Sequence, residues 1–169
     1  MKKLLPLVLA LVMALSVSAT AFAADTTINQ DSAGKTGSTA VTFHVDPTYT
    51  VTIPEKVELT KVDDGGTITY ESDLTVTAAA GVRLLAGEVI QVTLKSGSDF
   101  NLSTAADAAY KLPYTVTVGN NTIANDGVVA TFGTNNEAQT ATLHFAAGNP
   151  TYAGDYSDTV IFTLAIVNE

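Results

Sequence analysis

Apolar side chains alternate with threonine or other polar residues through most of this chain, and this period of two constrains the fold more than any other feature. The last run shows it clearly, because Val160, Phe162, Leu164 and Ile166 occupy every second position. Successive side chains of a β-strand point to opposite faces, so such a run predicts a strand with one face toward a core. Comparable runs occupy residues 41–45, 49–53, 57–59, 68–70, 74–78, 90–94, 114–118, 128–132, 141–145 and 160–166.

Turn residues separate these runs at short intervals. Asp63-Asp64-Gly65-Gly66 and Gly119-Asn120-Asn121 are strong turn signals. Short strands at this spacing indicate a sandwich or a barrel. We count about nine of them, because the runs 41–45 and 49–53 could form one long edge strand with a bend or bulge at Asp46-Pro47-Thr48. Only residues 78–88 and 103–109 have a helical alternative, and two glycines weaken the first. The predicted fold class is all-β, an Ig-like sandwich of antiparallel strands.

The closing run differs from the others, because the intervening positions are also largely apolar. Both faces of this strand therefore look buried, which predicts a central strand or one covered by another element. Phe162 lies in the middle of the run and is expected in the core. Just before it, Gly154-Asp155-Tyr156 is similar to the tyrosine position at a sandwich corner, where the hydroxyl bonds to backbone.

The N-terminus reads as an export signal. Lys2 and Lys3 precede an apolar run, and Ala21-Phe22-Ala23 fits a signal-peptidase site. The run is shorter than the roughly 20 residues of a membrane span. We therefore predict a signal peptide at 1–23, a flexible polar leader at 24–39 and a β-sandwich domain at 40–169. N-terminal sequencing of exported protein is expected to begin at Ala24, and an intact Met1 would contradict secretion.

Composition excludes several classes of function. The chain has no cysteine, so disulfides, thiol catalysis and cysteine metal sites are ruled out. Loss of Lys2 and Lys3 leaves six basic against 17 acidic side chains, a net charge of −11. Arg83 is the only arginine, and no basic cluster exists to bind phosphates. We expect no nucleic-acid partner and no membrane span in the mature chain.

Two segments resemble known families. The early strand 49–54 (YTVTIP) and the closing segment 152–162 (YAGDYSDTVIF) are similar to secreted single-domain β-sandwich proteins of Gram-positive, Firmicutes-type gut bacteria. The closing strand also resembles spore-coat-U-type pilins and WxL-type wall-binding proteins. The chain has no tryptophan and no cysteine pair, which departs from both of those groups. The resemblance implies a role at the cell surface, and no functional residue is carried over from it.

No constellation of residues predicts catalysis. His44 and His144 occupy outward strand positions and could bind a metal only with further ligands, so we expect two solvated residues and no cofactor. Asp63 with Asp64, and Asp155 with Asp158, offer loop oxygens for Ca²⁺, although solvated turn acids explain them better. Neither a nucleophile motif nor a groove with aromatic platforms is evident. The protein is therefore predicted not to be an enzyme.

The leading hypothesis is a secreted or cell-surface structural or adhesive protein. Val41, Phe43 and Val45 follow the polar leader and have the composition of a strand that is donated to a neighbouring sheet edge. Self-association through this strand is one alternative, and a monomer with a frayed N-terminus is the other. A carbohydrate-binding module for cell-wall or host glycans is the runner-up, and an exposed line of tyrosines would favour it.

Overall fold

The computed structural model describes residues 27–104 and 109–169. The expected signal peptide, residues 1–23, lies outside the described residues, as does most of the segment 103–109. Within the described ranges, no helix is long and apolar enough to cross a membrane. The chain divides into two units, Met1–Phe43 and His44–Glu169.

The described part of the first unit has little regular structure. A 3-10 turn spans Ala33–Lys35. Val41 and Phe43 belong to no strand, and their exposed fractions are 92% and 89%. The prediction of a strand at residues 41–45 is therefore wrong for the isolated chain. An alternating segment becomes a strand only where a neighbouring backbone accepts and donates hydrogen bonds, and none of the described residues does so here.

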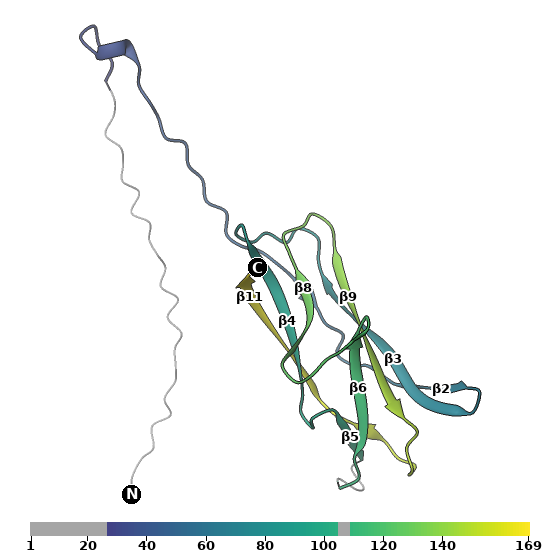
Figure 1. Cartoon of the computed structure of the whole chain (residues 1–169). Helices are drawn as coiled ribbons and strands as arrows, with labels where there is room; N and C mark the ends of the chain where they lie inside the picture. Colours follow the sequence, from purple (N-terminus) through teal and green to yellow (C-terminus); the bar gives the residue numbers. More distant parts are fainter. Residues whose placement is uncertain (1–26, 105–108) are drawn as a thin grey trace, which may run out of the picture. The chain divides into compact units, whose positions relative to one another are not determined.

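A sheet of eight strands forms one layer of the second unit (Figure 1). Its main path is β1 (Val51–Thr52), β3 (Thr67–Ala78), β9 (Gln139–Gly148), β6 (Leu112–Val118), β5 (Asn101–Thr104) and β10 (Tyr156–Ser157). Beside this path, β2 (Thr60–Asp64) pairs with β3, and β7 (Asn121–Thr122) pairs with β6.

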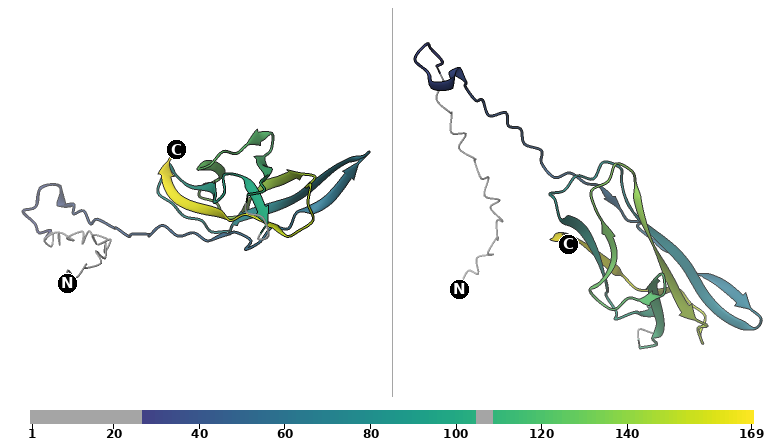
Figure 2. Two further views of the ribbon diagram at one scale, coloured as in Figure 1. Left: turned by 90° about the horizontal axis from the view of Figure 1, so that it is seen from below. Right: turned by 45° about the horizontal axis from the view of Figure 1, so that its top comes forward.

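The hairpin of β2 and β3 confirms the strongest turn signal in the sequence. Gly65 and Gly66 have φ of 61° and 100°, which only glycine adopts without strain. The Asp63 carboxylate accepts a hydrogen bond from the Gly66 N–H at 3.1 Å. The hairpin reaches past the ends of the neighbouring strands (Figure 2). Residues 57–59, predicted as a strand, lie before β2, and residues 68–78 form one strand instead of two.

The second layer is a sheet of three strands in the order β11 (Val160–Asn168), β4 (Glu88–Ser96) and β8 (Gly127–Phe132). Every strand pair in both sheets is antiparallel. The eleven described strands thus confirm an all-β sandwich, with two more strands than expected. The closing strand β11 pairs only with β4 and is an edge strand, so its prediction as a central or covered strand is wrong.

The core lies between the two sheets. Val76, Leu143 and Val116 from the larger sheet, and Ile90 and Leu94 from β4, have no exposed surface. The inward side chains of β11 are less well covered, because Phe162 and Leu164 are only half-buried against this core. On the opposite face, Ile161 is 53% exposed. The residues predicted as core in β11 therefore lie at its margin, since β11 has a neighbour on one side only.

Candidate functional site

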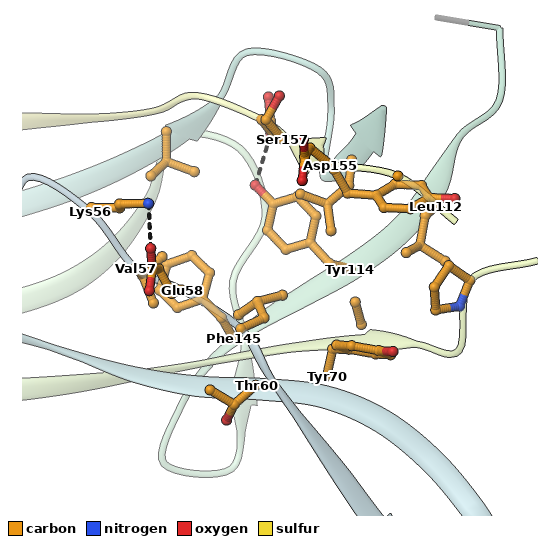
Figure 3. A pocket seen from close by; sticks show the side chains of 18 of the residues that line it. Lys56, Val57, Glu58, Thr60, Tyr70, Leu112, Tyr114, Phe145, Asp155 and Ser157 are labelled. Carbon is orange, nitrogen blue, oxygen red and sulfur yellow. Dashed lines mark hydrogen bonds and ion pairs between the residues drawn. The ribbon is translucent and has the colours of Figure 1, made fainter. Parts of the chain in front are cut away.

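A groove of about 980 Å³ opens at the margin of the sandwich (Figure 3). Its floor is the inward face of the larger sheet, where Tyr70, Tyr114 and Phe145 lie. One wall is the segment 55–60, and the other is the segment 150–160, which leads into β11.

The strand register explains why the floor is hollow. Ala147 of β9 lies opposite Tyr70 of β3 on one side and opposite Tyr114 of β6 on the other. The small side chain of Ala147 therefore lies between the large side chains of Tyr70 and Tyr114 on neighbouring strands, which leaves a depression in the inward face of the sheet. Phe145 stacks on Tyr114 with ring centroids 6.3 Å apart, which lines the depression with aromatic carbon.

One wall of the groove, and the edge strand that continues the other wall, present backbone without partners; in the second wall itself, Tyr156 and Ser157 pair with β5, and Val160 is the first residue of β11. β11 pairs only with β4, so the N–H and C=O groups along its outer edge bond to no described residue. In the opposite wall, residues 55–59 make no backbone hydrogen bond with any described residue. Val57 and Leu59 nevertheless pack against the core, while Lys56 and Glu58 point outward and pair with each other. Apolar and polar residues thus alternate in the segment 55–59 as in a strand, although no strand pairs with it among the described residues.

A cluster of hydrogen bonds closes one end of the groove. Ser96, at the end of β4, donates to Asp158 at 2.6 Å, and the Tyr114 hydroxyl donates to the same carboxylate oxygen at 2.8 Å. Burial alone would raise the pKa of Asp158, but these bonds and that from the Thr159 N–H outweigh burial and hold the pKa below its usual value. Burial and then the bond to Asp158 raise the pKa of Tyr114.

This cluster joins the two sheets. The Ser96 hydroxyl also accepts hydrogen bonds from the backbone N–H groups of Ser98 and Phe100. Ser96 is itself buried. The hydrogen bonds of Asp158 favour its ionised form and connect the start of β11 to β4 and β6.

Three tyrosines form the outer end of the wall. The Tyr156 hydroxyl donates to the Tyr152 carbonyl at 2.7 Å, which confirms the expected bond from this tyrosine to backbone. Tyr110 meets the rings of Tyr152 and Tyr156 edge to face, at centroid distances of 5.0 and 6.0 Å. Rings in this arrangement do not form the line of exposed flat faces that would favour a carbohydrate-binding module.

The candidate residues named from the sequence are not brought together by the structure. His44 pairs with Asp46 at 3.0 Å, whereas His144 contacts Asp73 at 2.8 Å on the outer face of the larger sheet. No group of three histidine or acidic side chains able to hold a metal occurs among the described residues. Asp63 belongs to the hairpin turn and Asp158 to the hydrogen-bond cluster, so both have structural partners.

Sequence reasoning missed the groove. The one signal that could have indicated it is the alternation of Val57 and Leu59 with Lys56 and Glu58 directly after a proline, because proline interrupts a ladder. The absence of a strand between this segment and β11 is a property of the topology, which no local pattern encodes.

An antiparallel β-sandwich with one open margin is thus the class that the fold defines. No protein-family model matches the sequence, and no curated protein matches it. Two solved structures are similar to it at low identity. One is described as "Chaperone-tip adhesin complex is vital for synergistic activation of CFA/I fimbriae biogenesis" (15% identity, TM-score 0.44). The match covers 69% of this chain and 41% of that chain. The other is the P pilus rod subunit PapA (12% identity, TM-score 0.45), matched over 69% of this chain and 99% of that one.

Proposed function

We propose that this chain is a secreted, non-enzymatic structural or adhesive subunit of the cell surface, and that it assembles by strand exchange. The segment 41–45 of one copy enters the groove of the next. The observation that carries the proposal is the unpaired backbone of residues 55–59 in one wall, together with the free edge of β11, which begins at Val160 in the other wall. A strand placed between them would gain hydrogen bonds from either wall.

The leader supplies a suitable strand. Val41, Phe43 and Val45 alternate with Thr42 and His44, so one face of the segment is apolar. This face matches the aromatic floor made by Tyr70, Tyr114 and Phe145. Burial of a phenylalanine side chain stabilises by about 1.5–3 kcal/mol, which supports Phe43 as the central contact.

A copy cannot place this strand in its own groove. The Thr50 carbonyl bonds to the Ala79 N–H at one end of β3, whereas the nearest residue of the floor, Phe145, lies opposite Ser72 of β3. Seven residues of strand separate Ala79 from Ser72, which is about 23 Å. Phe43 lies seven residues from Thr50 and reaches at most about 25 Å when fully extended, and the turn that would reverse the chain shortens this reach below the distance required. In-place pairing therefore leaves Phe43 and Val45 short of the floor.

The same reach selects one arrangement of two copies. The leader joins the domain at the end where β11 finishes, since Thr48 bonds to Arg83 and Glu169 bonds to Gly87. We call this end the leader pole. The groove opens at the other end, beside residues 150–155, which we call the groove pole. Because the leader is short, it reaches the groove of an acceptor copy only when the leader pole of the donor copy abuts the groove pole of the acceptor. The donated strand then runs antiparallel to β11 of the acceptor.

Head-to-tail contacts of this kind do not close on themselves. A heterologous interface between unlike surfaces produces an open chain of subunits unless its rotation closes a ring. A reciprocal dimer would have to place two copies side by side in opposite directions, so that each leader pole lay beside the partner's groove pole. The open head-to-tail arrangement that we propose instead predicts a series of oligomers whose size grows with concentration.

The test is the oligomeric state of the exported chain across concentration. Sedimentation velocity is expected to show a ladder of species, and Phe43→Asp is expected to abolish it, because the groove would bury an unpaired charge. Ile28→Asp is the matched control, since Ile28 is an exposed apolar residue of the same leader outside the alternating run. A ladder that survives Phe43→Asp or deletion of residues 24–45, or a strict monomer at millimolar concentration, would refute strand exchange.

A further inference from the structure

We infer that the leader pole of one copy also binds the groove pole of the next through side chains, with Leu85 and Arg83 of the first against Tyr152 and Asp155 of the second. This interface rests on the proposed strand exchange and adds to it a contact that the exchanged strand does not make. The occupant of the hollow at the leader pole is thus a second copy of this chain.

The short tether makes the contact unavoidable. Val45 lies three residues before Thr48, which is held to Arg83 by two backbone hydrogen bonds of 2.9 and 2.8 Å. Three extended residues span at most about 10 Å. When Val45 and Phe43 occupy the groove of a neighbour, Arg83 must therefore lie near the opening of that groove, where Tyr152 and Asp155 form the wall.

The leader pole presents an apolar hollow with one unmatched cation. In the chain before exchange, a hollow of about 260 Å³ is lined by Val45, which would leave it with the donated strand, and by residues that would stay in place: Asp46, Pro47, Arg83, Leu84, Leu85 and Thr134. Leu85 is 58% exposed there. Asp46 is paired with His44, whereas Arg83 forms no ion pair with any described residue.

The groove pole offers the complementary chemistry. Tyr152 is 60% exposed, the most of the large apolar side chains in this unit, although its ring already rests against Tyr110. Asp155 is exposed and makes no ion pair among the described residues. An aromatic ring therefore faces a hollow with an exposed leucine, and an unmatched carboxylate faces the only arginine of the chain. Tyrosine and arginine are also the residue types that dominate the energy of protein interfaces.

Charge reversal within a single chain tests the pairing, because each head-to-tail interface contains one copy of each pole. Arg83→Glu places two carboxylates together, and we expect the association constant between chains to fall about fivefold, the upper range for an exposed ion pair. Asp155→Arg is expected to weaken association to a similar extent. The double variant Arg83→Glu with Asp155→Arg restores an opposite pair and is expected to recover the original constant. Leu85→Ser is expected to weaken association about tenfold, since it removes the apolar contact.

Two measurements separate this interface from strand exchange. The first is binding of a synthetic peptide of residues 38–46 to the Phe43→Asp chain, which cannot donate its own strand. The peptide carries no leader pole. Arg83→Glu and Leu85→Ser in the acceptor chain are therefore expected to leave the affinity for the peptide unchanged. The second is chain–chain association, in which Lys95→Glu is the matched control, since Lys95 is an exposed cation of β4 and carries the same change of charge.

The outcomes are distinct. Peptide binding together with loss and recovery of chain–chain association in the charge variants supports the interface. Peptide binding with chain–chain association unchanged by Leu85→Ser and Arg83→Glu overturns the interface and leaves strand exchange intact. Absence of peptide binding overturns strand exchange, and this interface with it. A fall caused equally by Lys95→Glu would assign the effect to net charge and overturn the pairing.

Discussion

The centre of the sandwich and its open margin use the same sequence pattern and reach different degrees of burial. In the centre, Val76, Val92 and Leu143 alternate with outward residues and have no exposed surface. At the margin, Phe162 and Leu164 alternate in the same way and stay half-buried. The central strands have a neighbour on each side, whereas β11 has one neighbour only. Alternation therefore selects the face of a strand, and the number of neighbours sets how completely that face is covered.

The outward face of β11 adds to this contrast. Ile161 is 53% exposed, while the outward residues Thr75 and Thr142 of β3 and β9 are polar and lie opposite each other. An edge strand with apolar residues on both faces is one that natural proteins normally protect, because its free backbone promotes pairing with other chains. The free edge of β11 is thus the surface at which the proposed strand exchange would add a strand.

The largest effect that separates the two regions is expected from Leu143→Ala. Leu143 is fully buried in β9, so the substitution leaves a cavity and should lower the free energy of unfolding by about 2–5 kcal/mol. Urea denaturation measures this change. Thr142→Ala, one residue away on the outward face, is the control and should change stability by less than about 0.5 kcal/mol. Equal losses in the two variants would mean that the faces of β9 are reversed.

A smaller effect is expected from Phe162→Ala at the margin. A buried phenylalanine costs about 3–5 kcal/mol on truncation, which the sequence alone led us to expect here. Because Phe162 is only half-buried, we now expect a loss of about 1–2 kcal/mol in the monomer. The measurement is urea denaturation in the Phe43→Asp background, where no strand is exchanged. A loss above about 3 kcal/mol would show that the margin is as well packed as the centre.

Sequence reasoning succeeded where a local pattern decides the structure. The Asp63–Gly66 turn follows from glycine's freedom at positive φ, and the Tyr156 bond to backbone follows from a short motif before a strand. It failed where the answer depends on strand order. Nothing in the sequence of β11 tells that its second neighbour is missing. Ala147 lies between Tyr70 and Tyr114 only because β3, β9 and β6 are adjacent, so the groove could not be predicted from any one segment.

The smallest effect, and the one that tests what holds the margin in place, concerns Asp158. Hydrogen bonds from Ser96 and Tyr114 favour its ionised form, so its pKa is lower in the folded than in the unfolded chain. A lowered pKa contributes stability that is fully present above the unfolded value, about 3.9, and is lost as the pH falls through the folded value. Acid should therefore release the start of β11 before it affects the centre.

Asp158→Asn removes this contribution, and we expect it to lower the free energy of unfolding at pH 7 by about 1 kcal/mol, since an amide accepts weaker hydrogen bonds than a carboxylate. It should also flatten the fall in stability below about pH 4, because the group no longer titrates. Asp64→Asn serves as the control, because Asp64 is an exposed acid of the hairpin turn with no side-chain hydrogen bond to the described residues. Urea titrations from pH 2.5 to 7 measure both quantities. Parallel pH profiles for the two variants would show that Asp158 does not fix the margin, and that β11 is held by its ladder with β4 alone.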